Sequence, residues 1–341
     1  MIGTRIAALT VAAGVAALAV SASLASAGSQ AGSLTVYSGR EQEVVERLFQ
    51  RFEQATGIKV KVRYGESAEL AATLAEEGKS SPADVFFAQD AGSLGATALG
   101  GRLERLPAAL LNRVGRQYRD PSGRWVGTSG RARVIAYNTK LVKPADLPRS
   151  VFDLTRPRWQ GKLGFPPTNA SFQAFVTAMR LTAGEQRTRD WLRAIKRNAP
   201  KLYDKNTSVV EAIAAGEIEV GLVNHYYLAI LKQEQPAAPV ANLFLKGGDP
   251  GALVNVAGAG IVTGTKHQAE ARRFVAYLLS AAGQRYYTTA EEAEYPLVAG
   301  IKPQAGLPPL AAIQGPNMDL GKLGPELEQT LELLAEVGFT A

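Results

Sequence analysis

The sequence predicts an α/β fold of two lobes joined by crossing strands, and three observations lead to this prediction. The chain has 341 residues, a length that favours two domains or lobes over one. Short apolar strands alternate with amphipathic helices in both halves, which is typical of mostly parallel sheets that bind ligands at the carboxyl ends of their strands. Two long extended stretches, 125–139 and 251–263, interrupt the alternation, and we expect them to cross between the lobes.

The N-terminus has the pattern of a secretory leader. Arg5 is followed by a run of small and apolar residues that ends in Ala25-Ser26-Ala27. A charged residue, an apolar region and an A-x-A site in this order predict a signal peptide over 1–27, cleaved after Ala27. A permanent membrane anchor is the alternative, but polar residues and glycine interrupt the run. We therefore expect a mature protein that is free in an extracytoplasmic space.

The first half of the mature chain alternates strictly. A strand over 34–37 leads to a helix over 41–55, then to the alternating strand IKVKVRY, a helix from Ser67 to Gly78 and the strand in ADVFFAQD. Residues just after strands, and one in the first crossing stretch, are candidates for a ligand cleft: Ser38, Gly39, Arg40, Glu41, Gln89, Asp90 and Arg131.

The alternation restarts after the first crossing stretch. The strand KLGFPP leads to a helix over 171–183, a basic helix through Trp191 and a helix that ends at Gly216. After the second crossing come the helix in EARRFVAYLLSAAG and the closing helix in PELEQTLELLAEVG. The predicted first lobe comprises 28–133 and 252–300, and the predicted second lobe comprises 134–251 and 301–341.

The stretch EVGLVNHYYLAILK carries the sharpest functional signal. Val220 to Val223 predict a buried strand, and Asn224 stands where the N-cap of a following helix is expected. Tyr226 and Tyr227 then lie in a first helical turn, about 100° apart, so their phenols can converge on one point. Two phenolates suit a small, hard cation such as Fe(III). The alternative is a pair of aromatics at the edge of the core, which is how we interpret Tyr286-Tyr287.

A second signal is the polar loop that enters the helix at 171–183. Thr168, Asn169, Ala170 and Ser171 present hydroxyls, an amide and free N–H groups together, which is what a small oxyanion needs. Ordinary helix capping explains the same residues, and Asn206 in YDKNTSVVEAI has the same ambiguity. His225 could be a third metal ligand, but we prefer exposure to solvent or packing between the lobes because its helical direction differs from that of the tyrosines.

Composition excludes several other classes of function. The chain has no cysteine and two histidines, which excludes cysteine nucleophiles and disfavours a zinc site. Neither G-x-S-x-G, nor H-E-x-x-H, nor a Walker or dinucleotide fingerprint is present. The net charge of +7 comes from scattered Lys and Arg, which does not indicate nucleic acid but is compatible with an anionic ligand.

The stretches LTVYSGR, PADVFFAQD, SGRARV, KNTSVVEAI, VNHYY and AEYPL together resemble the periplasmic ferric-iron-binding proteins of ABC importers. The resemblance covers nearly the whole mature chain and implies a type II periplasmic solute-binding fold, with two α/β lobes hinged on two crossing strands. It implies that Tyr226 and Tyr227 bind Fe(III). It also implies that Asn206, Asn224 and the helix start over 168–171 hold a synergistic anion such as phosphate or carbonate.

The chain departs from the pattern of this family in the first lobe. Where the best-known members carry a ligand histidine, this chain has Glu41, and where they carry a ligand glutamate it has Gln89. Glu41 could bind the metal directly or could simply be favoured at a helix start, and water or a larger anion could fill the remaining positions.

The resemblance implies a monomeric binding protein, not an enzyme, that delivers iron to an ABC permease in the periplasm. A protein of the same fold that binds a non-metal anion or a small organic ligand is the nearest alternative. An extracytoplasmic enzyme built on the same scaffold is a second one, because fold does not fix function.

Overall fold

The computed structural model describes residues 32–289 and 292–340. The predicted signal peptide over 1–27 lies outside the described residues. Among the helices of the described ranges, none is both long and apolar enough to cross a membrane.

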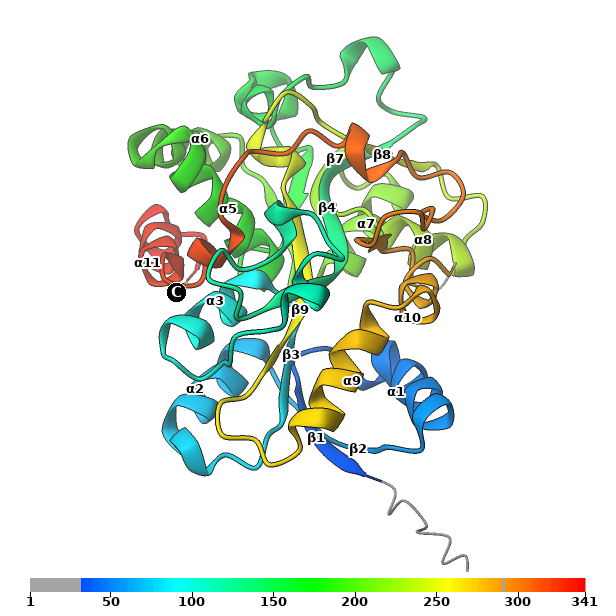
Figure 1. Ribbon diagram of the computed structural model, residues 1–341. Coiled ribbons are helices and arrows are strands. Elements are labelled where there is room, and N and C mark those ends of the chain that lie inside the picture. Colours follow the sequence, from blue (N-terminus) through cyan, green and yellow to red (C-terminus); the bar gives the residue numbers. More distant parts are fainter. Residues whose placement is uncertain (1–31, 290–291, 341) are drawn as a thin grey trace, which may run out of the picture. The chain divides into compact units, whose positions relative to one another are not determined.

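In the described part of the chain, ten strands form one sheet in the order β2-β1-β3-β9-β4-β7-β5-β6, and β8 and β10 pair with β4 (Figure 1). The strands are β1 (Ser33–Ser38), β2 (Lys59–Tyr64), β3 (Val85–Ala88), β4 (Val126–Asn138), β5 (Leu163–Phe165), β6 (Lys201–Leu202), β7 (Val220–Asn224), β8 (Val240–Leu243), β9 (Val254–Ile261) and β10 (Tyr295–Pro296).

The two predicted crossing stretches are β4 and β9, which run side by side through the centre of the molecule (Figure 1). The first half of β4 pairs with β9, and its second half, from Arg133 onward, pairs with β7. Almost every residue of β4 is buried because strands flank it on both sides. One strand therefore carries side chains that face both halves of the sheet.

The prediction of a mostly parallel sheet is wrong in the middle of the sheet. β1 is parallel to β2 and β3, and β5 is parallel to β6 and β7. Every pairing made by β4 or β9 is antiparallel. The reason is that β4 and β9 each pass from one half of the sheet into the other. In the part of the chain that is described, no helical crossover, the connection that makes adjacent strands parallel, joins them to the strands beside them.

Helices cover both halves of the sheet, and the predicted ones are present with small shifts of their ends. They are α1 (Gln42–Thr56), α2 (Ser67–Glu77), α3 (Ala91–Leu99), α4 (Ala108–Leu111), α5 (Ala170–Ala183), α6 (Glu185–Arg197), α7 (Asn206–Ala215), α8 (Tyr227–Glu234), α9 (Gln268–Leu278), α10 (Ala281–Tyr286) and α11 (Leu327–Val337). α1 ends where Gly57 adopts the left-handed conformation at φ 74° and donates its N–H to the carbonyl of Glu53.

The buried apolar side chains form a large cluster around β1, β3 and α9 and further clusters around β5, β7, α5 and α7. These separate clusters support the division into two lobes that we propose. The C-terminal segment contributes to both of them. Leu320 and Leu323 pack with the first cluster because they lie against α3, whereas Leu333 and Leu334 of α11 pack against the second lobe. The placement of 320–323 differs from the predicted assignment of all of 301–341 to the second lobe.

Candidate functional site

The tyrosine pair lies at the junction of β7 and α8. All five residues of β7 are buried, Tyr226 is the N-cap of α8 and Tyr227 is its first residue. The Tyr226 hydroxyl donates a hydrogen bond of 3.0 Å to the Tyr227 hydroxyl, and the ring centroids are 4.3 Å apart. Both side chains are half-buried. The two phenolic oxygens thus converge closely enough to contact one small cation.

The predicted role of Asn224 as N-cap is wrong. Asn224 is the last residue of β7 and pairs with Arg133 of β4, and the N–H of His225 extends this pairing by donating to the carbonyl of Ala132. The sheet therefore holds the chain extended for one residue more than expected. The amide of Asn224 is left to face the interior next to Arg133.

Burial raises the pKa of Tyr227 well above its ordinary value, and the neighbouring Tyr226 raises it further, while Arg131 and a hydrogen bond with Asn206 act in the opposite sense. The phenol of Tyr227 is therefore protonated at neutral pH in the ligand-free protein. A cation that binds its oxygen must displace the proton.

The start of α5 provides a polar corner opposite the tyrosines. Asn169 is the N-cap, and its Oδ1 accepts from the N–H and the hydroxyl of Ser171 at 3.0 and 2.6 Å. The same Oδ1 accepts from the side-chain amide of Asn206 at 3.1 Å, which ties α7 to α5. Thr168 is exposed, and its carbonyl accepts from Gln173. α5 has 14 residues, so its free N–H groups and its dipole favour an anion at this end.

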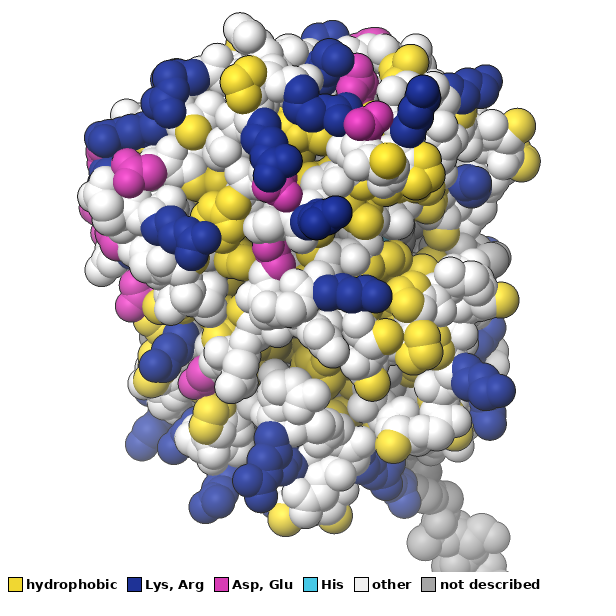
Figure 2. Space-filling view, turned by 90° about the horizontal axis from the view of Figure 1, so that it is seen from above, with side chains coloured by type: hydrophobic (Ala, Val, Ile, Leu, Met, Phe, Trp, Pro, Cys, Tyr) yellow, Lys and Arg dark blue, Asp and Glu magenta, His cyan; other side chains and the backbone are white. Residues whose placement is uncertain are grey.

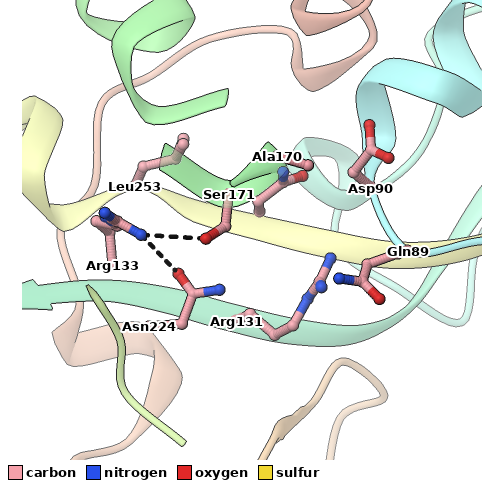
Figure 3. Close-up of a pocket in the computed structure, with 9 residues that line it drawn as sticks. Gln89, Asp90, Arg131, Arg133, Ala170, Ser171, Asn224 and Leu253 are labelled. Carbon is pink, nitrogen blue, oxygen red and sulfur yellow. Dashed lines mark hydrogen bonds between the residues drawn. The ribbon is translucent and has the colours of Figure 1, made fainter. Parts of the chain in front are cut away.

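A small cavity of about 20 Å³ adjoins this corner, which is room for about one water-sized group (Figure 3). Its lining brings together six residues that were predicted as candidates with three that were not. The predicted ones are Gln89, Asp90, Arg131, Ala170, Ser171 and Asn224, and the others are Arg133, Leu253 and Asn255. Asp90 caps α3 and accepts from the N–H and hydroxyl of Ser93, and its carboxylate points away from Arg131 (Figure 3).

Two arginines of β4 dominate the electrostatics of the cavity. Arg131 and Arg133 are 4% and 2% exposed, and among the described residues neither has a carboxylate within ion-pairing distance. Arg133 donates to the Ser171 hydroxyl at 3.2 Å, to Asn224 Oδ1 at 3.5 Å and to the Leu222 carbonyl at 2.7 Å. Its burial lowers its pKa to about 9, and the tyrosines act in the opposite sense. The Nε of each arginine lacks a hydrogen-bond partner in the structure, as expected of donors that await an anion.

Sequence reasoning missed Arg133 although a signal was present. Residues two apart on a strand face the same side, so Arg131 and Arg133 in SGRARV belong together. Glu294 was missed as well, because its partner Arg40 is distant in the sequence.

The first-lobe candidates form a tight turn after β1. The Ser38 hydroxyl donates to the Arg40 carbonyl at 3.0 Å, and a Cβ on Gly39 would meet the Ser67 hydroxyl oxygen at 2.0 Å, so only glycine fits there. Arg40 is buried in an ion pair with Glu294 at 2.8 Å. Glu41 is exposed, caps α1 without a side-chain hydrogen bond and does not line the cavity.

His225 packs between the two halves of the sheet. It is 1% exposed, its Nδ1 accepts from the Ala132 N–H at 3.2 Å, and its Nε2 lies 2.8 Å from the Ala293 carbonyl. Its ring lies 4.8 Å from that of Tyr295. Both nitrogens are thus engaged within the protein, which favours the packing role over that of a third ligand. Burial lowers its pKa to about 4.

Tyr286 and Tyr287, the comparison pair, are both buried at the end of α10, and the Tyr286 hydroxyl donates to the Val44 carbonyl. Their packing role is confirmed. Within residues 32–289 and 292–340, no three side chains of His, Asp or Glu lie together in a way that could hold a metal. A cation at the Tyr226 hydroxyl would therefore depend on phenolate oxygens and on oxygens brought by another ligand.

Comparison with known proteins places these features in a family. A family model described as bacterial extracellular solute-binding protein matches residues 80–311. The Fe(3+)-binding periplasmic protein of Serratia marcescens is 33% identical over 329 residues, which cover 95% of this chain and 96% of that protein.

Two solved structures are similar along most of the chain. Iron-bound HitA from Pseudomonas aeruginosa has a TM-score of 0.83 and 35% identity, and the match covers 90% of this chain and 99% of HitA. The Trichodesmium protein (IdiA, FutA) in complex with iron and citrate has a TM-score of 0.81 and 30% identity, with 91% and 100% covered. This chain therefore has the two-lobed type II fold of periplasmic binding proteins and belongs to the bacterial extracellular solute-binding proteins, a family of transport proteins and not of enzymes.

Proposed function

We propose that this protein binds Fe(III) between its lobes through Tyr226 and Tyr227, together with an oxyanion, and delivers it to an ABC permease. The observation that carries the proposal is the 3.0 Å separation of the two phenolic oxygens at the start of α8. Phenolates are hard oxygen donors, and Fe(III) is a hard cation that lowers the pKa of the phenols it binds.

The oxyanion completes the coordination that the protein leaves open. Ala170, Ser171, Asn224 and the unpartnered donors of Arg131 and Arg133 surround a cavity of about 20 Å³, which suits one oxygen of a phosphate or carbonate whose other atoms lie outside the cavity. Asn169 and Asn206 support this corner by their mutual hydrogen bond, and Thr168 precedes it in the loop. Glu41 is a weaker candidate for a first-lobe ligand, since it is exposed and does not line the cavity.

The delivery of iron to the permease depends on the arrangement of the candidate site residues, which come from both lobes. Arg40 and Gln89 belong to segments before the crossing strands, whereas the tyrosines and Ser171 belong to the second lobe. A ligand that contacts both lobes stabilises the closed arrangement, which a permease can recognise. We propose that the chain works as a monomer in the periplasm after cleavage near Ala27. The relatives named periplasmic and iron-binding support this proposal.

A binding protein for a non-metal anion is the second candidate, and the two buried arginines without carboxylate partners favour it. In that protein the tyrosines would donate hydrogen bonds and would not coordinate a metal. Visible absorbance distinguishes the two functions, because a phenolate–iron complex absorbs visible light by charge transfer and an anion complex does not.

The test is a metal analysis of the protein as purified, combined with an absorbance scan before and after addition of ferric iron with phosphate or carbonate. Iron binding predicts one iron per chain and a visible band. Tight anion binding that is unaffected by iron, without a visible band, would favour the second candidate.

A further inference from the structure

The edge of the second-lobe sheet that lies opposite the cavity is basic. The parallel strands β5, β6 and β7 all start at this edge, and β7 ends at the cavity with Asn224. We define the basal surface as the exposed side chains around these strand starts and the end of β4. They are Lys140, Leu141, Lys143, Arg149, Arg156, Arg158, Lys162, Arg197, Lys201 and Leu202.

Contacts between the segments show that the basal surface is continuous. Arg158 reaches Asp146 at 3.3 Å and Glu219 at 4.0 Å, and Lys162 reaches the same glutamate at 2.6 Å. The Lys201 ammonium donates to the Glu217 carbonyl at 3.1 Å. The segments 140–149, 156–162, 197–202 and 216–219 thus lie side by side, although no basic tract stands out in the sequence.

Positive charge is concentrated in this region of the chain. Residues 139–205 contain fourteen Lys and Arg against five Asp and Glu, a net charge of +9, whereas the remaining residues sum to −2. Asp146, Asp153 and Glu219 are already paired with Arg158, Arg156 and Lys162. Five exposed cations of the basal surface have no ion pair among the described residues, namely Lys140, Lys143, Arg149, Arg197 and Lys201. Figure 2 shows Lys and Arg side chains spread over the end of the molecule that carries the segment near residue 150 (Figure 1).

The basal surface also has a hollow and two exposed leucines. The hollow has a volume of about 290 Å³, and Arg149, Arg156 and Arg158 line it together with Asp146 and Asp153. Because Asp153 pairs with Arg156 and Asp146 pairs with Arg158, Arg149 is the arginine of the hollow that keeps an uncompensated charge among the described residues. Leu141 and Leu202 are 49% and 46% exposed, and both belong to segments that meet the loop at Gly216 and Glu217. Arginines in a hollow suit a phosphate group, and exposed leucines suit the apolar border of a lipid headgroup layer.

We propose that the basal surface docks on a bilayer that contains anionic phospholipids. Arg149 in the hollow binds a headgroup phosphate, the surrounding lysines are attracted by the negative surface potential, and Leu141 and Leu202 insert among the headgroups. Exposed aliphatic side chains favour a lipid surface over single-stranded nucleic acid, whose bases stack on aromatic rings. Docking through this edge leaves the cavity at the other end of β7 free, and it places the protein where a membrane partner is found. The inference goes beyond the proposed function and does not depend on iron.

The test is co-sedimentation of the mature protein with vesicles of phosphatidylcholine alone or with about one third phosphatidylglycerol. We expect binding to the anionic vesicles that falls at least about tenfold between 50 and 300 mM salt, since screening weakens it. The variant Lys143→Glu/Arg149→Glu/Lys201→Glu should lose most of this binding. The matched control Lys61→Glu/Lys79→Glu/Lys266→Glu removes the same charge from exposed first-lobe positions and should keep most of it.

Further variants and competitors separate the contribution of the leucines from that of the charges and test other ligands. Leu141→Ser/Leu202→Ser should weaken binding without changing its salt dependence, and inorganic phosphate at millimolar concentration should not compete. Thermal unfolding and iron binding of all variants confirm that they fold. Equal losses in both triple variants would overturn the proposal by showing that only net charge matters. Absence of vesicle binding at low salt, or binding to duplex DNA without binding to vesicles, would also overturn it.

Discussion

The phenolic oxygens of Tyr226 and Tyr227 lie 3.0 Å apart because Tyr226 is the N-cap of α8 and Tyr227 is its first residue. We predict that Tyr226→Phe or Tyr227→Phe lowers iron affinity by more than about 100-fold, since loss of a direct ligand should exceed the 10- to 100-fold effect of removing a supporting group. Competition against a chelator measures this affinity.

Tyr286→Phe is the matched control, because its hydroxyl binds the Val44 carbonyl within the core. It should leave iron affinity unchanged and lower the free energy of unfolding by about 1 kcal/mol. If Tyr286→Phe lost iron while Tyr226→Phe kept it, the wrong pair would have been assigned.

Because His225 is buried, we predict that the free energy of unfolding of the ligand-free protein depends on pH. Burial lowers its pKa from 6.5 to about 4, so between these values the unfolded chain binds a proton that the folded protein does not. Stability is therefore full above about pH 6.5 and falls as the pH drops toward 4, by about 3 kcal/mol from this residue.

Urea unfolding of the wild type, His225→Gln and His267→Gln at pH 7 and pH 4 measures this effect. The His225 variant should lose less stability between the two pH values than the wild type. The His267 variant, whose ring is 49% exposed, should resemble the wild type. Equal losses for the wild type and His225→Gln would show that another group causes the acid sensitivity.

At the scale of elements, the start of α5 joins the second-lobe helices to the crossing strand. Ser171 contacts both Asn169 and Arg133, so one hydroxyl connects the N-cap to β4. Ala170 lines the cavity beside it. The anion that we propose for this corner would depend on the size of residue 170 more than on the identity of the exposed Thr168.

We predict that Ala170→Leu fills the cavity, excludes the anion and raises the pH at which iron is lost. A titration of the visible absorbance from neutral to acid, at a fixed anion concentration, compares this variant with the wild type. Thr168→Ala is the control and should follow the wild-type curve. Coincident curves for all three proteins would place the anion elsewhere.

The elements could largely be predicted from the sequence, because apolar periodicity and glycine stops are local signals. The strand at 220–223, the helix at 171–183 and both crossing strands appear where the pattern indicates. The position of Asn224 inside β7 could not be predicted, because pairing with β4 across 91 residues overrides the local capping preference. The ion pair of Arg40 with Glu294 spans 254 residues, so no local pattern could reveal it.

The candidate site could be predicted in part for the same reason. Tyr226 and Tyr227 are neighbours in the sequence, so their convergence follows from local helix geometry. The cavity combines Gln89, Arg131, Ser171 and Asn224, which the fold brings together from distant segments. Their individual contributions could be anticipated from strand ends and helix starts, but the shared cavity could not.

For the whole molecule, the proposed iron binding should be coupled to protons. The phenol of Tyr227 has a raised pKa, so it should be protonated at neutral pH before a metal binds. We predict release of about two protons per iron from the tyrosines, after correction for the iron source and the anion. Lower pH then weakens binding, and release in an acidic medium is favoured.

A pH-stat titration with a defined ferric chelate measures the released protons. Tyr227→Phe, examined at iron concentrations that saturate it, should release about one proton fewer than the wild type. Equal release from the wild type and this variant would mean that Tyr227 does not bind the metal as a phenolate.

The central claim is that the two adjacent phenols bind iron, and a visible-absorbance titration tests it most directly. Ferric iron is added stepwise with phosphate or carbonate to the wild type, Tyr226→Phe/Tyr227→Phe and Tyr286→Phe. We predict a charge-transfer band that rises linearly to one iron per chain in the wild type and in Tyr286→Phe, and that is absent from the double variant. An undiminished band in Tyr226→Phe/Tyr227→Phe, or no band in the wild type with iron bound, would contradict the claim.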